Sequence, residues 1–147
     1  MGRIPLVVTV VCMAGALSAC TSSTPEREVA MPDAEAGPLE VVRAYVDALD
    51  ANDEETASRL VTSEHYESSW IGSVEAVTEL KAWEPVREDP RWSGHPRTAD
   101  IVRVPVKFDV TWSDPDPSVE DGQQMWSYLL IRDEGSGRWL IFDEGMG

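Results

Sequence analysis

The sequence is poor in cysteine, with only Cys12 and Cys20 in 147 residues. Two cysteines cannot build the framework of several disulfides that stabilises many small secreted domains. Cys12 lies inside an apolar segment near the N-terminus and Cys20 directly follows that segment. Neither belongs to the part of the chain that has the composition of a folded domain. That domain therefore depends on packing for its stability.

Basic residues are also scarce. The sequence has 12 Lys and Arg against 27 Asp and Glu, which gives a net charge of −15. Phosphate backbones and anionic lipid headgroups repel such a surface. This balance excludes nucleic acid as a partner and excludes membrane binding by charge. Histidine is limited to His65 and His95, which are 30 positions apart, so no paired-histidine motif is present.

Long apolar runs are missing as well, and the run Ile4–Leu17 has 14 residues. A helix that spans a bilayer needs about 20 apolar residues. Arg3 precedes the run, and the small residues Ser18 and Ala19 follow it. This order is typical of a secretory signal peptide. We therefore expect residues 1–19 to be a signal for export.

The segment Leu17–Cys20, with the sequence LSAC, resembles the lipobox of bacterial lipoproteins. The resemblance implies that the Cys20 thiol is joined to diacylglycerol, that the chain is cut before Cys20, and that acyl chains such as palmitate anchor it. Two or three acyl chains, at about 0.8 kcal/mol per CH₂, hold a protein stably at a membrane. The expected location is the extracytoplasmic face of the cell membrane. The alternative is an ordinary signal peptide in which Cys20 is incidental.

Residues 20–37 follow the signal as a polar stretch that contains two prolines and no apolar period. This composition predicts the lipidated Cys20 and a disordered tether. The alternative is that part of the stretch packs on the domain. Residues 38–147 then form a single predicted domain, which is long enough for a hydrophobic core.

Helical signals come first in this domain. Pro38 suits a first helical turn, and one face of the following helix carries apolar residues at Leu39, Val42, Tyr45, Val46 and Leu49. Asn52 or Asp53 is placed to cap a second short helix, whose apolar contacts are Ala57, Leu60 and Val61. A third helical turn is expected within residues 65–70.

The pattern then changes to period two. Residues 102–112 alternate between an apolar face and a polar face, which predicts a long half-buried strand with a bulge or an edge at Pro105. Residues 123–145 predict a hairpin with its turn at 134–137. Residues 77–86 fit a strand or a helix. The order of elements predicts the α+β class, with N-terminal helices packed on a strongly curved antiparallel sheet.

The opening PLEVVRAYVDALDANDEETASRLV, the long strand and the closing RWLIFDEG resemble the nuclear transport factor 2-like superfamily, also called SnoaL-like or cystatin-like. The likeness is closest to small bacterial lipoproteins of that type. It implies a cone in which the sheet wraps around a long helix, with a cavity at the open end. Since curved sheets of this family often pair, it also leaves a homodimer open.

Enzymes of this family, such as ketosteroid isomerases and SnoaL-type cyclases, use an acidic or histidine base in the cavity together with a polar partner. The resemblance implies candidates of these types at Asp100, Asp109, Asp143, His65, Tyr66 and Tyr128. Strand alternation places Asp143 on the face of Ile141, at the rim of a cavity. The alternative is a solvated Asp143 carboxylate, which is normal beside Glu144 at a strand end. No base stands at a readable spacing from a group that would orient it.

We therefore predict a binding module without catalysis and without a cofactor, whose partner is a small apolar ligand or an envelope protein. The alternatives are a cavity enzyme of the isomerase or cyclase type and a cell-wall glycan binder with Trp92 as the sugar contact. A buried ionisable pair would favour the enzyme. Trp112, Trp126 and Trp139 are expected in the core or cavity wall.

The acidic loop from Asp114 has alternating oxygen ligands that hint at calcium: Asp114, Asp116, Ser118 and Glu120. It fails the EF-hand pattern, because Val119 stands where glycine is required and Met125 where the bidentate glutamate belongs. We predict a solvated loop and no metal site.

Overall fold

The computed structural model describes residues 27–114, 119–132 and 137–146. The predicted signal peptide, the lipobox with Cys20, most of the predicted hairpin turn and part of the acidic loop lie outside these residues. Within them, no helix is long and apolar enough to cross a membrane.

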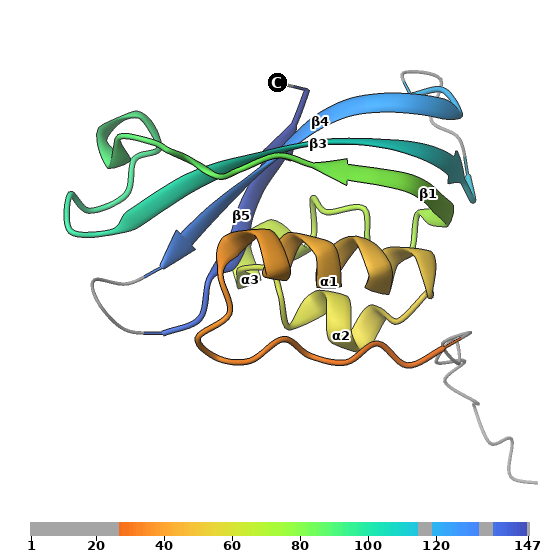
Figure 1. Cartoon of the computed structure of the whole chain (residues 1–147), viewed down its shortest axis with the longest axis horizontal. Helices are drawn as coiled ribbons and strands as arrows, with labels where there is room; N and C mark the ends of the chain where they lie inside the picture. The colour runs from red at the N-terminus through yellow and green to blue at the C-terminus, as the bar shows by residue number, and fades with distance from the viewer. Residues whose placement is uncertain (1–26, 115–118, 133–136, 147) are drawn as a thin grey trace, which may run out of the picture.

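Three helices precede an antiparallel sheet and lie together on one of its faces (Figure 1). The described helices are α1 (Pro38–Asp50), α2 (Glu54–Ser58), α3 (Ser63–Tyr66) and the 3₁₀ helix η1 (Pro90–Trp92). The described strands are β1 (Val74–Ala82), β2 (Val86–Arg87), β3 (Asp100–Trp112), β4 (Gly122–Arg132) and β5 (Leu140–Gly145). The strand order is β1-β3-β4-β5, and β2 also pairs with β3. The predicted α+β class with helices on a curved antiparallel sheet is confirmed.

Helix α1 forms the centre of the core. Pro38 occupies its first turn, and the Glu40 carboxylate accepts a hydrogen bond from the Gly37 N–H at 2.9 Å. The predicted apolar face is confirmed, since Val42, Tyr45, Val46 and Leu49 are buried, and Leu39 packs beside them half-buried. The Asp53 side chain caps α2 by accepting from the Thr56 N–H at 3.1 Å, as the sequence allowed.

Strand β3 shows the alternation that the sequence predicted. Its buried residues in the core are Val102, Val104, Val106, Phe108, Val110 and Trp112. Pro105 does not mark an edge of the sheet, because β3 is flanked by β4 on one side and by β1 and β2 on the other. It lies where the partner changes from β1, which ends opposite Val106, to β2, which begins opposite Arg103. A residue without an N–H fits this gap.

Strand β5 contains an extra residue, and this changes which of its side chains face the helices. Leu129 pairs with Asp143, but Leu130 pairs with Ile141, so Phe142 has no partner of its own on β4. Such a bulge shifts the alternation by one residue. Ile141 and the Glu144 side chain therefore both face inward, and Asp143 is exposed. The expectation that Asp143 shares the face of Ile141 is wrong for this reason.

Residues 27–36 pack along α1 and α2 as an extended segment, which we call the N-terminal strap (Figure 1). The Val29 N–H donates to the Asp53 carboxylate at 2.9 Å, and Arg138 Nη1 donates to the Pro32 carbonyl at 2.9 Å. Val29 and Met31 contact the core. The prediction of a disordered tether through Gly37 is therefore corrected for residues 27–37. The polar composition concealed two apolar contacts and backbone hydrogen bonds to distant residues.

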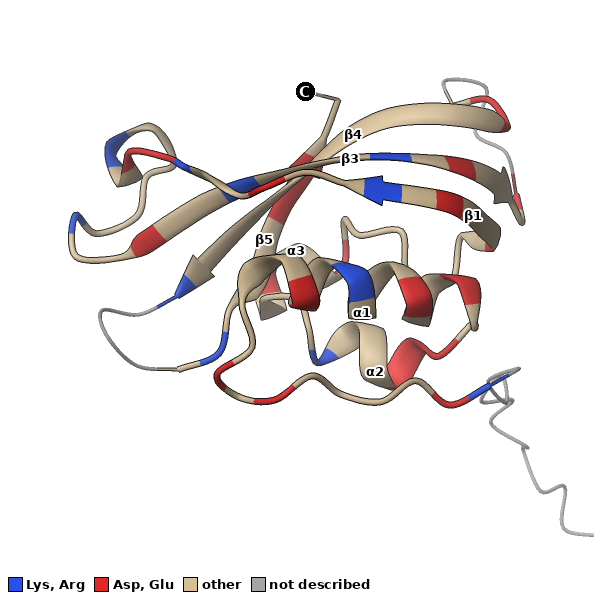
Figure 2. Ribbon diagram, viewed as in Figure 1, with Lys and Arg blue, Asp and Glu red and all other residues tan. Residues whose placement is uncertain are grey.

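Acidic residues dominate the helical side of the molecule. Figure 2 shows Asp and Glu along the strap and on the visible surfaces of α1 and α2, with few Lys or Arg among them. This distribution agrees with the net charge of −15. The helical side therefore repels anionic partners.

Candidate functional site

Four titratable side chains meet inside the molecule, each from a different element. They are His65 of α3, Glu144 of β5, Tyr45 of α1 and Tyr128 of β4, and we call them the buried polar cluster. His65 Nε2 lies 3.6 Å from Glu144 Oε1, and the two side chains are 5% and 3% exposed. The rings of Tyr45 and Tyr128 meet edge to face at 5.6 Å between centroids, and both residues are 0% exposed.

The local fold explains why these side chains converge. Glu144 and Tyr128 are direct partners across the β4–β5 ladder, so their side chains lie on the same face of the sheet. Thr62 N–H donates to the Ile141 carbonyl at 2.8 Å, which holds the start of α3 against β5. The Thr62 hydroxyl then caps α3 by accepting from the His65 N–H at 3.3 Å. His65 is thus brought beside Glu144.

The cluster holds buried polar atoms that have no hydrogen-bond partner among the described residues. These atoms are Tyr45 Oη, Tyr128 Oη, His65 Nε2 and both carboxylate oxygens of Glu144. Buried polar atoms in proteins are usually paired, and an unpaired one costs about 1–3 kcal/mol. Several such atoms in one place therefore need an explanation other than stability.

The environment shifts the protonation of the cluster. Burial raises the pKa of Glu144, although His65 and the nearby Trp70 backbone oppose the shift. Burial, followed by the charge of Glu144, raises the pKa of Tyr45 and of Tyr128 well above the ordinary tyrosine value. Both phenols therefore stay protonated and can donate a hydrogen bond. A carboxyl group whose pKa is raised toward neutrality suits general acid–base chemistry.

One ring nitrogen of His65 is already oriented. The Ser68 hydroxyl lies 3.2 Å from His65 Nδ1, and it also donates to the His65 carbonyl at 3.0 Å. The other nitrogen, Nε2, faces Glu144. This arrangement places the His65 imidazole beside the Glu144 carboxyl group, two groups suited to acid–base chemistry, and the Ser68 hydroxyl fixes the orientation of the ring.

The structure brings two of the predicted candidates, His65 and Tyr128, into this cluster. Asp143 is exposed, and its carboxylate accepts from the Glu144 N–H at 2.9 Å. Tyr66 is 44% exposed. Asp109 lies on the face of β3 opposite the core.

Asp100 has a structural role. It binds Arg132 at 2.9 Å and Arg87 at 3.3 Å, and the hydrogen bond from Arg132 is the main cause that lowers its pKa. These ion pairs explain the presence of the Asp100 carboxylate at the end of β3, so no functional site is needed to explain it.

Sequence reasoning misses Glu144 and Tyr45. It considers Glu144 only as the neighbour of Asp143, because the bulge at Phe142 leaves no mark in the local pattern. It places Tyr45 on the core face of α1, where only the hydroxyl distinguishes this residue from the valines around it. The signal in the sequence that could have indicated this site residue is a tyrosine at a core position that an apolar residue could fill.

Aromatic side chains border the cluster. The ring of Trp70 lies 4.3 Å from Trp126, 4.6 Å from Trp112 and 6.0 Å from Phe108, measured between centroids. Trp126 Nε1 is buried and has no hydrogen-bond partner among the described residues. The prediction that Trp112, Trp126 and Trp139 belong to the core or its wall is confirmed: Trp112 and Trp139 are buried, and Trp126 packs on the core half-buried. Trp92 is 87% exposed, and its contact with sugars stays a prediction.

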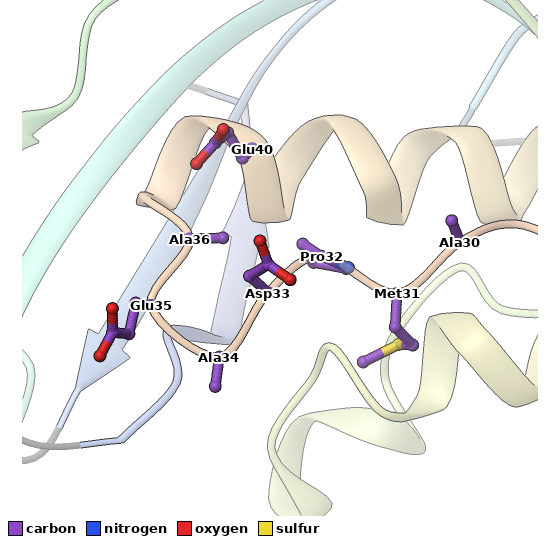
Figure 3. A pocket seen from close by; sticks show the side chains of 8 residues that line it. All are labelled: Ala30, Met31, Pro32, Asp33, Ala34, Glu35, Ala36 and Glu40. Atoms are coloured by element: carbon purple, nitrogen blue, oxygen red, sulfur yellow. The ribbon is translucent and has the colours of Figure 1, made fainter.

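A surface groove lies between the strap and the start of α1 (Figure 3). Its polar lining consists of the carboxylates of Asp33, Glu35 and Glu40, and Glu40 already accepts from the Gly37 N–H. Among the residues that the structure describes, no group of three or more His, Cys, Asp or Glu side chains is placed to hold a metal ion. The buried polar cluster is therefore the stronger candidate site.

No protein-family model matches this sequence, and no curated protein matches it. Its structure is similar to the crystal structure of a "Putative Scytalone Dehydratase" from Novosphingobium aromaticivorans, with 15% sequence identity and a TM-score of 0.45. The match covers 69% of this chain and 74% of the other. A likeness at this level says nothing about a reaction in this protein.

Proposed function

We propose that the protein binds a small molecule at the buried polar cluster and catalyses an isomerisation by proton transfer there. The observation that carries this proposal is the buried His65–Glu144 pair, 3.6 Å apart, with unpartnered oxygens on Glu144 and on the two tyrosines beside it. The sequence favoured binding without catalysis, on the ground that no oriented base could be found. The buried pair supports the enzyme alternative instead.

The residues suit a defined sequence of proton movements. The Glu144 carboxylate removes a proton from a carbon next to a carbonyl group of the ligand. Tyr128 and Tyr45 donate hydrogen bonds to the oxyanion that develops on the carbonyl oxygen. The proton then returns from Glu144, or through His65, to a different carbon. The product has the same atoms as the substrate, so no co-reactant is required.

Proton abstraction can be tested with cyclohexanone in D₂O, since the loss of its α-proton signals is followed by NMR. We expect the wild-type protein to accelerate this exchange and Glu144→Gln to abolish the acceleration. Asp143→Asn is the matched control, because it removes the neighbouring, exposed carboxylate. Equal exchange rates for wild type and Glu144→Gln would overturn the catalytic role and leave a binding module.

We also propose that the protein works at the extracytoplasmic face of the cell membrane, anchored by lipid on Cys20. Support comes from the LSAC segment after an apolar run of 14 residues. Only residues 21–26 separate Cys20 from the strap that packs on the helices. The lipid would therefore keep the domain close to the bilayer. Metabolic labelling with a radioactive fatty acid should mark the wild type and not Cys20→Ser, and a labelled Cys20→Ser protein would refute the anchor.

A further inference from the structure

One tryptophan of the protein is exposed to solvent, although this residue type is highly buried on average. Trp92 is 87% exposed, the highest value for any large apolar side chain among the described residues. It belongs to η1, in the segment between β2 and β3, residues 88–99, which we call the β2–β3 loop. Figure 1 shows this loop at one end of the sheet, where it projects past the helices. The helices therefore leave this end of the molecule accessible.

The β2–β3 loop is anchored to the sheet at its start and near its middle. Glu88 N–H donates to the Ile101 carbonyl of β3 at 2.9 Å. The ring of His95 meets the ring of Phe142 on β5 nearly edge to face, at 4.6 Å between centroids and an interplanar angle of 81°. Trp92 is thus presented on a segment that is already in place, so a ligand that packs on it need not order the loop first.

A polar groove lies beside η1. Its polar lining consists of Arg87, Glu88, Asp89, Arg97, Thr98 and Asp100. Trp92 N–H donates to the Asp89 carbonyl at 3.0 Å, which closes one 3₁₀ turn. Side chains three residues apart in such a turn lie on the same side of it. Trp92 therefore lies on the side of η1 that borders the groove.

The groove offers donors and acceptors in near balance, since two guanidinium groups and three carboxylates line it. Figure 2 shows both signs of charge on this loop, in contrast with the acidic helical side. An anionic ligand would meet the three carboxylates, and an apolar ligand would take charged groups out of water without replacing their hydrogen bonds. A neutral ligand with many hydroxyls fits this lining, because each hydroxyl both donates and accepts.

The exposed indole narrows the class of ligand further. The face of an aromatic ring carries partial negative charge and attracts the weakly positive hydrogens of C–H groups. A pyranose whose hydroxyls are all equatorial has C–H groups on both faces and hydroxyls around its rim.

We infer that the β2–β3 loop binds a neutral glycan of β-linked glucose-type pyranoses, with one ring stacked on Trp92 and its hydroxyls bonded to the groove. The inference does not depend on the proposed function, because no residue of the buried polar cluster lines this groove.

The test uses triacetylchitotriose, a neutral β-linked trisaccharide, and the full chain labelled with 5-fluorotryptophan. The fluorine signal of Trp92 is assigned by its absence in Trp92→Phe, and we expect the sugar to shift this signal in a saturable manner. In calorimetry, Trp92→Ala should weaken binding at least about tenfold. Its melting temperature should stay unchanged, because the side chain is 87% exposed.

Trp83→Ala is the matched control. The Trp83 indole is 36% exposed, and the Lys81 ammonium already lies over its ring at 5.1 Å from the centroid. The affinity of this variant should change by less than about twofold. Arg97→Gln, which removes an exposed guanidinium from the groove, should weaken binding about threefold or more.

Four results would each overturn the inference. They are a Trp92 signal that shows no saturable shift with triacetylchitotriose or with cellotriose, wild-type affinity in Trp92→Ala, wild-type affinity in Arg97→Gln, and equal losses in Trp92→Ala and Trp83→Ala. Saturable binding of cellotriose alone would support the site and show that the acetamido group is not required. Glu144→Gln should bind the sugar as tightly as wild type, and a loss of binding there would place the ligand at the buried polar cluster and refute the surface site.

Discussion

Tyr128→Phe should make the protein more stable, although it removes a polar group from the centre of the molecule. The Tyr128 side chain is fully buried, and its hydroxyl has no hydrogen-bond partner among the described residues. A buried hydroxyl without a partner costs about 1–3 kcal/mol in proteins. Phenylalanine keeps the ring, and with it the edge-to-face contact with Tyr45. We therefore expect the free energy of unfolding to rise by about 1–3 kcal/mol.

Chemical and thermal unfolding measure this change. One kcal/mol shifts the melting temperature of a domain of this size by about 4–8 °C, so a gain of about 1–3 kcal/mol should raise the melting temperature by roughly 4–24 °C. Its dependence on denaturant should stay unchanged, because the same surface is buried. Leu130→Ala, on the same face of β4 and also fully buried, is the contrasting control and should lose about 2–5 kcal/mol.

A loss of stability in Tyr128→Phe would refute the reasoning, because it would mean that the hydroxyl is well bonded in the folded protein. A gain in stability together with slower proton exchange on cyclohexanone would show a hydroxyl retained for function at a cost in stability. Such trade-offs are common at functional sites.

Three further predictions concern the cluster, the strap and the core. Because the folded protein raises the pKa of Glu144, folding favours the neutral carboxyl group. The contribution of this group to the free energy of unfolding is fully present below about pH 4, the ordinary glutamate range. It is lost as the pH rises through the pKa of Glu144 in the folded state. Glu144→Gln should therefore gain stability relative to wild type with rising pH in urea unfolding series, and a constant difference would contradict this. Burial alone would raise the pKa of Asp53, but hydrogen bonds from Val29 and Thr56 lower it overall, so the carboxylate stabilises the fold above about pH 4 and ceases to do so in acid. Asp53→Ala should cost about 1–2 kcal/mol and speed proteolysis of the strap, and unchanged cleavage would argue against its docking. Val106→Asp, at a fully buried position, should cost more than about 3 kcal/mol, whereas Lys107→Asp on the opposite face should cost less than about 1 kcal/mol; equal melting shifts would contradict the assignment of the two faces.

The elements that could be predicted from the sequence are those whose signal is local. Helix α1 follows from its apolar period and Pro38, and β3 follows from strict alternation over 11 residues, 102–112. The cap at Asp53 is likewise a local feature. In each case the residues that decide the structure lie within a few positions of one another, so the pattern contains the answer.

The features that could not be predicted depend on contacts between distant parts of the chain. The strap is held by Asp53, which is 24 positions from its partner Val29. Glu144 faces inward because Phe142 is unpaired on β4, and that depends on the register between two strands. The alternation within β5 alone indicates the opposite face. The extra residue in β5 makes Asp143 exposed and Glu144 buried, the reverse of what alternation predicts. The sequence pattern therefore places the candidate site at Asp143, one position before Glu144.

Stability does not explain the composition of the buried polar cluster. Phenylalanine would fill the space of Tyr45 or Tyr128, and apolar residues in place of a buried ionisable pair are often as stable or more stable. His65 and Glu144 lie beyond hydrogen-bonding distance of each other, so their attraction only partly offsets the cost of burying them. Four residues that lie close together nevertheless carry titratable side chains with buried polar atoms that have no hydrogen-bond partner among the described residues. Such an arrangement lowers stability and prepares the site for a ligand that supplies the missing hydrogen bonds, which is the reason to look for function here before the exposed carboxylates of the surface.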